Sequence, residues 1–163
     1  MKKFWKKRRF GEKGLTSIEL VIAIMIIMIL FVFSLDILEI SFKNYSIQNI
    51  SRSVIRTLSV QGGVSTNTPV TSSELIDRVE YGLENSGIDP QTARATFNQG
   101  SASPLNSLRF QTELVDFREP VYFRIEIDHE WHIARWFGIE QTSTFSAQKE
   151  GISEHFRPEG GGW

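Results

Sequence analysis

The run LVIAIMIIMILFVF at residues 20–33 decides how this chain is arranged, because it holds only apolar side chains and neither Gly nor Pro. With Leu15 and Ile18 before it and Leu35 after it, the stretch reaches about 20 residues, and a helix of that length spans about 30 Å, the thickness of a bilayer core. Its β-branched residues do not argue against a helix in lipid, where each backbone group must be satisfied within the segment. The sequence therefore predicts one transmembrane helix at about residues 15–37.

Charge sets the expected orientation of this span. Seven of the 18 Lys and Arg residues, but only one of the 19 acids, lie in residues 1–14. Basic residues before a span favour a cytoplasmic N-terminus, so we expect the rest of the chain outside the cytoplasm. A cationic start also precedes ordinary secretory signals, but Ser34-Leu35-Asp36 is a poor cleavage site after the apolar run.

Composition excludes several classes of function. Beyond residue 14 the chain keeps 11 basic and 18 acidic residues, and this acidic balance predicts no contact with nucleic acid. There is no cysteine, which rules out disulfides, thiolate zinc sites and cysteine nucleophiles. No catalytic triad order and no Gly-rich phosphate loop is present, so we expect no enzyme and no cofactor.

The helix is expected to continue past the span as an amphipathic helix. Gly62-Gly63 supplies the stop, so a single helix is predicted over residues 15–60, followed by a polar linker at 61–72. The apolar positions that recur at helical spacing are Ile37, Ile40, Ile47, Ile50, Val54 and Leu58.

A small α+β domain is expected at residues 73–148. Its helix would be capped by Ser72 or Ser73 and end at Gly87, and its buried stripe would be Leu75, Ile76, Val79 and Leu83. Residues 88–106 have mostly loop composition, with a short strand or turn at 92–97.

Alternating apolar and polar residues predict strands at 108–114, 121–127 and 132–139 in an antiparallel sheet. Asp128-His129-Glu130 is expected to form the hairpin connection between the last two strands. Residues 149–163 are expected to be a polar, Gly-rich tail.

The segment Gly14-Leu15-Thr16-Ser17-Ile18-Glu19-Leu20 resembles the class III signal of type IV pilins and pseudopilins, whose usual form is G-F-T-L-I-E-L. Leu15 and Ser17 depart from that form, and the other five positions match. The resemblance implies that residues 1–14 are a prepilin leader, that a prepilin peptidase cuts between Gly14 and Leu15, and that the new amine of Leu15 is N-methylated.

Glu19 is the residue for which this resemblance has a physical reason. A carboxylate within an apolar helix costs a few kcal/mol to insert, so it needs a role or a partner. In a filament, Glu19 of an incoming subunit could pair with the Leu15 amine of a neighbour. Such a pair would set the axial register, because any other stagger leaves a buried charge unpaired.

The resemblance implies a structural subunit, a minor pilin or pseudopilin of a type IV pilus-like or Tad-like filament. Its partners would be a prepilin peptidase, other subunits through the N-terminal helix, the membrane and, indirectly, an assembly platform and ATPase. The chain would reside in the inner or cytoplasmic membrane and then in an extracytoplasmic filament or on the cell surface. Two alternatives stay open: a pseudopilin of a secretion or DNA-uptake system, and an unprocessed signal-anchored binding protein.

Three further groups of residues could form a binding site or a contact between subunits. Asp128-His129-Glu130-Trp131-His132 is not H-E-x-x-H, and on a strand its two histidines would point to opposite faces, so no metal site is predicted. Asp36 and Glu39 are expected at the outer membrane interface, where they need no special role, although they could meet basic residues of adjacent helices. The aromatic residues expected to form one cluster under a small sheet, or an exposed subunit contact, are Tyr122, Phe123, Trp131, Trp136 and Phe137.

Overall fold

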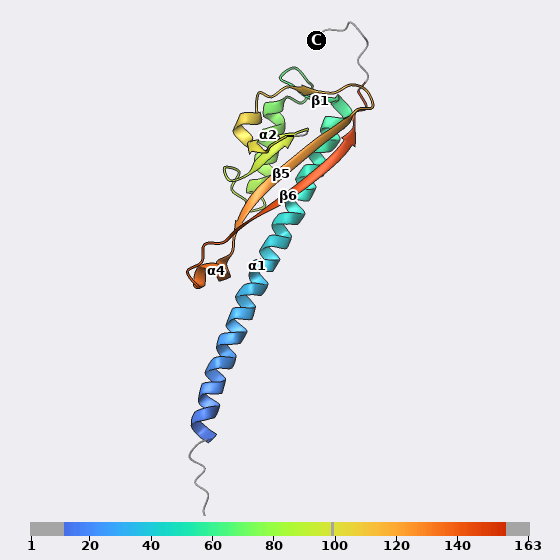
Figure 1. Ribbon diagram of the computed structural model, residues 1–163. Helices are drawn as coiled ribbons and strands as arrows, with labels where there is room; N and C mark the ends of the chain where they lie inside the picture. The colour runs from blue at the N-terminus through green and yellow to red at the C-terminus, as the bar shows by residue number, and fades with distance from the viewer. Residues whose placement is uncertain (1–11, 99, 156–163) are drawn as a thin grey trace, which may run out of the picture.

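The fold is α+β, as predicted: one long N-terminal helix carries a small domain of helices and antiparallel sheet (Figure 1). The computed structural model describes the backbone of residues 12–98 and 100–155, and side chains from Ser17 onward. Most of the predicted leader therefore lies outside the described residues. The helix, α1, runs from Glu12 to Gln61 without a break, and its 50 residues make it about 75 Å long.

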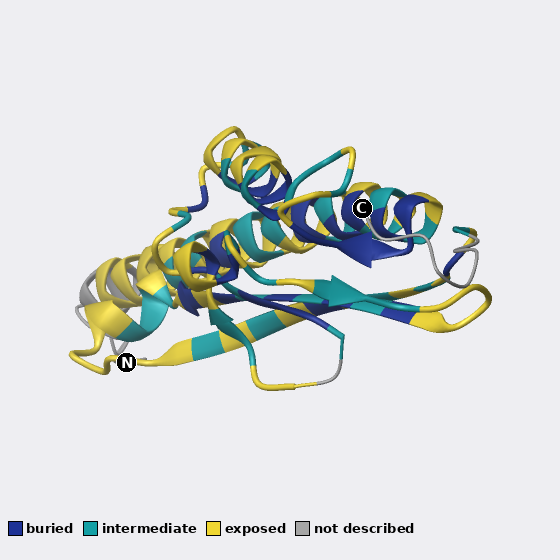
Figure 2. Ribbon diagram, turned by 90° about the horizontal axis from the view of Figure 1, so that it is seen from above, coloured by how far each residue is buried: buried dark blue, intermediate teal, exposed yellow. Residues whose placement is uncertain are grey.

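The C-terminal half of α1 forms one side of the core. Apart from Ser46, its buried side chains follow one another at alternating intervals of four and three residues, which keeps them on one helix face: Ile47, Ser51, Val54, Leu58 and Gln61. Figure 2 shows the buried residues gathered where the domain meets this half of α1, while the other half is exposed. The amphipathic pattern thus fixes where the domain packs.

The pair of glycines ends α1, as predicted. Gly62 and Gly63 have φ values of 71° and 112°, which few other residues adopt. A Cβ on Gly63 would also meet the carbonyl group of Glu113, because the short strand β1 (Gly63–Val64) pairs with β4 (Glu113–Leu114). The Gln61 side chain bonds the backbone of Val70 through both its amide atoms, so the segment after α1 is held against the domain.

Helix α2 (Ser72–Glu84) lies against α1, with Gly82 facing Ile50. Its buried stripe is the predicted one of Leu75, Ile76, Val79 and Leu83. The cap is Thr71, one residue before the predicted positions, and its hydroxyl accepts the Glu74 N–H at 3.2 Å.

The main sheet has the strand order β3-β2-β5-β6, with β2 at Arg94–Phe97, β3 at Ser103–Pro104, β5 at Pro120–Glu130 and β6 at Thr142–Ile152. All neighbours are antiparallel, and β5 pairs with β6 from Pro120↔Ile152 to Glu130↔Thr142. The predicted inward residues of β5 are all buried: Val121, Phe123, Ile125 and Ile127. Strand β6 packs directly on α1, since Gly151 faces Ser59.

The prediction of a strand at 108–114 is wrong. Only Glu113–Leu114 is extended, α3 (Leu105–Leu108) ends at the first residue of the predicted strand, and residues 109–112 form a turn and irregular chain. Contacts with α2 override the alternating pattern: the Ser72 hydroxyl donates to the carbonyl of Arg109 at 2.6 Å, and the Arg109 guanidinium bonds Asp77 and Glu80. Those carboxylates, Asp77 foremost, raise the pKa of Arg109.

The predicted end of the hairpin is also wrong. Asp128-His129-Glu130 belongs to β5, and residues 132–139 contain the short helix α4 (His132–Trp136) in place of a strand. Gly138, at φ 71°, follows that helix. The second long strand is β6, which extends to Ile152 and so includes the first residues of the expected tail.

Candidate functional site

The N-terminal half of α1 is covered by no other part of the described chain. No residue from 17 to 35 is buried, and the large apolar side chains from Leu20 to Met28 are each 50–64% exposed. The exposed surface is therefore apolar all round the helix and is not a single stripe. The helix is long and apolar enough to cross a membrane.

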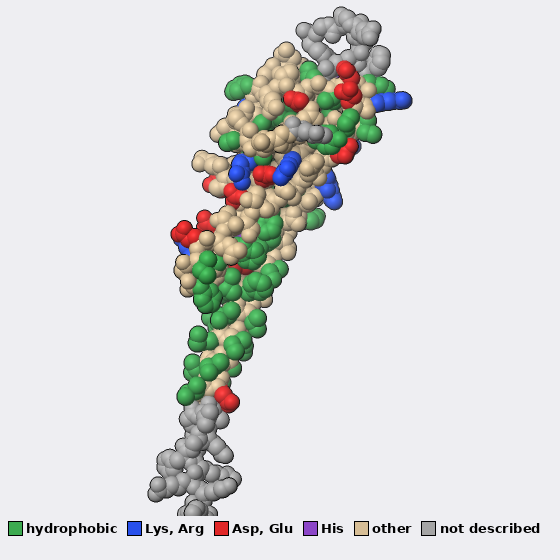
Figure 3. Space-filling model, viewed as in Figure 1, with side chains coloured by type: hydrophobic (Ala, Val, Ile, Leu, Met, Phe, Trp, Pro, Cys, Tyr) green, Lys and Arg blue, Asp and Glu red, His purple; other side chains and the backbone are tan. Residues whose placement is uncertain are grey.

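Glu19 is the only charged residue between positions 17 and 35. It is exposed, and it forms no hydrogen bond or ion pair with the residues whose side chains the structure describes. Figure 3 shows apolar side chains along this half of the helix, with an acidic side chain near its N-terminal end. Gly14 and Leu15, the predicted cleavage pair, lie in the first turn of α1, one helical turn before Glu19.

No protein-family model matches this chain, and neither a curated protein nor a solved structure is significantly similar to it. Its residues and their geometry therefore carry every argument about its role.

A polar cluster lies where the apolar half of α1 ends. Asp36 is 2% exposed, because α4 covers it. One carboxylate oxygen of Asp36 lies 2.9 Å from Nδ1 of His132, and the other accepts the Ile133 N–H at 3.0 Å. The second contact caps α4, whose own N-cap residue, Trp131, provides no side-chain acceptor.

Asp36 and Glu39 were expected to lie at the membrane interface without a special role. This expectation is wrong for Asp36, which is buried and bonded to α4. Glu39 lies one turn further along α1, with one oxygen 2.6 Å from Nζ of Lys43 and the other 3.7 Å from Nδ1 of His132. Lys43 is thus the partner of Glu39 within the chain.

His129 is a buried histidine without a polar partner. It is 2% exposed, and neither ring nitrogen has a hydrogen bond. Burial lowers its pKa, so the neutral ring is favoured. Its ring centroid lies 6.2 Å from that of His132, which corrects the expectation that the two point to opposite faces: β5 ends at Glu130, and His132 begins α4.

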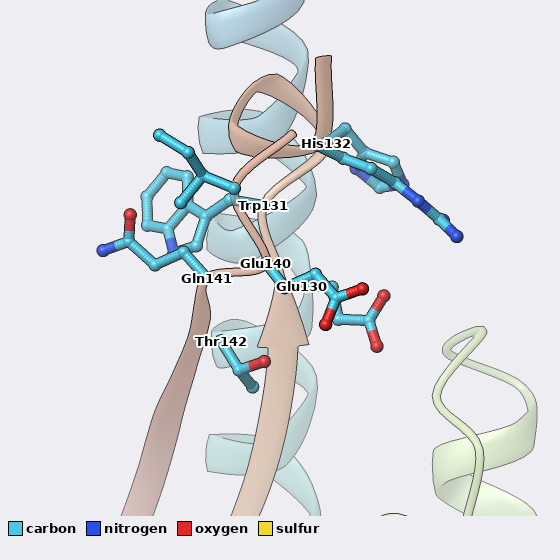
Figure 4. A pocket seen from close by; sticks show the side chains of 8 residues that line it. Glu130, Trp131, His132, Glu140, Gln141 and Thr142 are labelled. Atoms are coloured by element: carbon cyan, nitrogen blue, oxygen red, sulfur yellow. The ribbon is translucent and has the colours of Figure 1, made fainter. Parts of the chain in front are cut away.

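Two hollows flank this cluster. One, of about 200 Å³, lies at the hairpin tip, where Trp131 and Gln141 point to one side and Glu130 and Glu140 to the other (Figure 4). The second, of about 280 Å³, is lined by Glu39, Lys43, His129 and His132 among others. The second hollow is lined by carboxylates and by two imidazoles, one of which, His129, is buried without a hydrogen bond. It therefore holds more groups that could bind an ion than the first hollow does.

The predicted aromatic cluster is split in two. Phe123 is fully buried and packs against Phe97 with ring centroids 5.7 Å apart. Trp136 and Phe137 are 62% and 64% exposed on and after α4. Packing under the sheet is wrong for Trp136 and Phe137, because the strand on which it depended is a short helix at the hairpin tip, and the alternative of an exposed subunit contact stays a prediction for these two residues.

Proposed function

We propose that this chain is a pilin-like structural subunit, a minor pilin or pseudopilin, that is cut between Gly14 and Leu15 and assembled through the N-terminal half of α1. The observation that carries the proposal is a single unbroken helix that is apolar on all sides and uncovered over residues 17–35, with Glu19 as the only charge in that stretch. The segment Gly14 to Leu20 supports the same role by its resemblance to the class III signal.

An apolar helix surface of this kind must be shielded from water, because exposing apolar surface costs about 25 cal/mol per Å². Lipid can cover it before assembly, and the helices of neighbouring subunits can cover it afterwards. Since lipid tails and apolar side chains are similar environments, moving between them is nearly balanced, and an external ATPase could drive that exchange.

The position of Glu19 fits assembly better than static anchoring. A plain anchor gains nothing from a carboxylate one turn into its span, and inserting that group costs a few kcal/mol. After cleavage the amine of Leu15 offers a positive charge. A contact between Glu19 of one subunit and that amine of the next would neutralise both charges and fix the stagger between subunits.

The test is intact-protein mass and N-terminal sequencing of the chain, produced with and without a prepilin peptidase. The expected product begins at N-methylated Leu15, appears only with the peptidase, and is lost in Gly14→Val. Gly11→Val is the matched control, since it alters a leader glycine three residues upstream and should be cut normally. A chain that stays uncut would indicate a signal-anchored protein, and one cut beyond Phe33 a conventional secretory signal.

A further inference from the structure

The structure brings together three metal-binding side chains that lie far apart in the sequence. Asp36 and Glu39 come from α1, and His132 comes from the start of α4, 96 residues after Asp36. One ligand atom of each lies within 4.8 Å of the others. We propose that Asp36, Glu39 and His132 bind a divalent transition-metal cation of the Zn²⁺ type, which links the hairpin tip to α1.

The two carboxylates are oriented for such a role. Each directs one oxygen toward Nδ1 of His132, at 2.9 Å for Asp36 and 3.7 Å for Glu39. Their other oxygens are held by donors, the Ile133 N–H at 3.0 Å and Lys43 Nζ at 2.6 Å. Ligating carboxylates in metal sites are commonly fixed by outer hydrogen bonds of this sort.

His129 is the independent observation that points to a ligand. Its ring is 2% exposed, has no partner for either nitrogen, and lines the same hollow as Glu39 and His132. A buried polar ring without partners is costly, so such groups normally have a use. With its centroid 6.2 Å from that of His132, His129 stands beside the three ligands as a candidate for the fourth position.

The donor set selects the class of ion. Imidazole nitrogen with carboxylate oxygen suits Zn²⁺ and its neighbours in the transition series, whereas Ca²⁺ and Mg²⁺ prefer oxygen ligands alone. Charge agrees with this, because one ammonium, that of Lys43, lines the hollow together with four carboxylates, those of Glu39, Asp89, Asp128 and Glu130. The His132 side chain is 58% exposed, which gives an ion a route from solvent.

The inference does not depend on the proposed function. The site lies where the uncovered half of α1 ends and the domain begins, so a bound ion would hold α4 on α1 there. Asp36 already bonds both His132 and Ile133, and the ion would replace the first of these contacts by coordination.

The experiment is calorimetric titration of the tag-free, full-length chain in detergent micelles, stripped with a chelator and then titrated with Zn²⁺. We expect one ion per chain, and we expect His132→Gln to weaken binding by about tenfold or more. His132 is exposed, so this variant should fold. His155→Asn and Glu140→Gln are the matched controls, an imidazole and a carboxylate outside the three ligands, and both should bind as the unchanged chain does.

Asp36→Asn does not separate binding from folding, because Asp36 also caps α4. Co²⁺ substitution gives a second readout, since visible bands of tetrahedral Co²⁺ should appear in the unchanged chain and disappear in His132→Gln. The proposal is overturned if Zn²⁺ does not bind, if His132→Gln binds it equally well, or if Ca²⁺ and Mg²⁺ bind as tightly as Zn²⁺.

Discussion

The contact between β6 and α1 allows one substitution to be worked through in detail. Gly151 lies so close to α1 that a Cβ there would overlap the hydroxyl of Ser59 and come within 3.1 Å of Cγ1 of Ile55. Gly151→Ala should therefore overpack this contact, at about 1–3 kcal/mol. Alanine also restricts the unfolded chain, which offsets about 0.4–1 kcal/mol, and the middle of each range leaves a net loss of about 1–2 kcal/mol.

Urea unfolding of the full-length chain in micelles, followed by tryptophan fluorescence, measures this loss. With an m value of about 2 kcal/mol/M, the midpoint should fall by about 0.5–1 M. Gln148→Ala, at an exposed position of the same strand, is the control and should stay within about 0.5 kcal/mol.

The second half of the test removes the Ser59 hydroxyl that the new methyl group would overlap. Ser59→Ala deletes the hydroxyl and leaves the Ser59 Cβ at 3.5 Å from the new methyl group, an ordinary contact. In that background Gly151→Ala should cost less than half as much, a coupling that a double-mutant cycle detects. A loss below about 0.5 kcal/mol, or one that Ser59→Ala does not reduce, would refute the close packing of β6 on α1.

Three further outcomes are expected. If the chain assembles as proposed, Glu19→Gln should be processed normally yet reduce sheared filaments, seen by electron microscopy and immunoblotting, by about tenfold or more, because the proposed charge pair with the Leu15 amine would be lost; unchanged filament yield would contradict that pairing. Thr71→Ala should destabilise the domain by about 1 kcal/mol by removing the cap of α2, whereas Thr71→Ser should keep it, as measured by urea unfolding. Phe123→Ala should cost about 3–5 kcal/mol in the same assay, while Trp136→Ser, at an exposed site, should stay within about 0.5 kcal/mol; equal losses would show that the aromatic residues form one cluster after all.

The parts of the fold that could be predicted are those with a long, locally consistent pattern. The N-terminal helix has an unbroken apolar run, then a helical stripe, then two glycines, and each signal agrees with the next. Strand β5 was predictable for the same reason, because Val121 to Ile127 alternate without interruption and the alternating residues are buried.

The parts that could not be predicted depend on contacts between distant segments. Alternation at 108–114 is as regular as in β5, but Arg109 reaches α2 and holds the segment in a turn. The hairpin end was misplaced because polar residues at 128–130 look like a turn, whereas Asp128 remains paired with Thr144 in the sheet.

The cluster of Asp36, Glu39 and His132 has no local signal at all. Spacing rules for metal sites detect ligands that are close in sequence, and 96 residues separate Asp36 from His132. One hint was present in the sequence: His129 continues the alternation of inward-facing residues that ends at Ile127. It indicates a buried histidine only if the strand continues to Glu130, as β5 does.

The continuity of α1 has a mechanical consequence. Between Leu15 and Gln61 there is neither Gly nor Pro, and the helix passes without a break from its uncovered half into the half that carries the domain. The two halves therefore turn together about one axis. Adding or removing a single residue within 20–35 would rotate the whole domain by about 100° and move it about 1.5 Å along that axis, relative to the lipid or the helices that surround the apolar half.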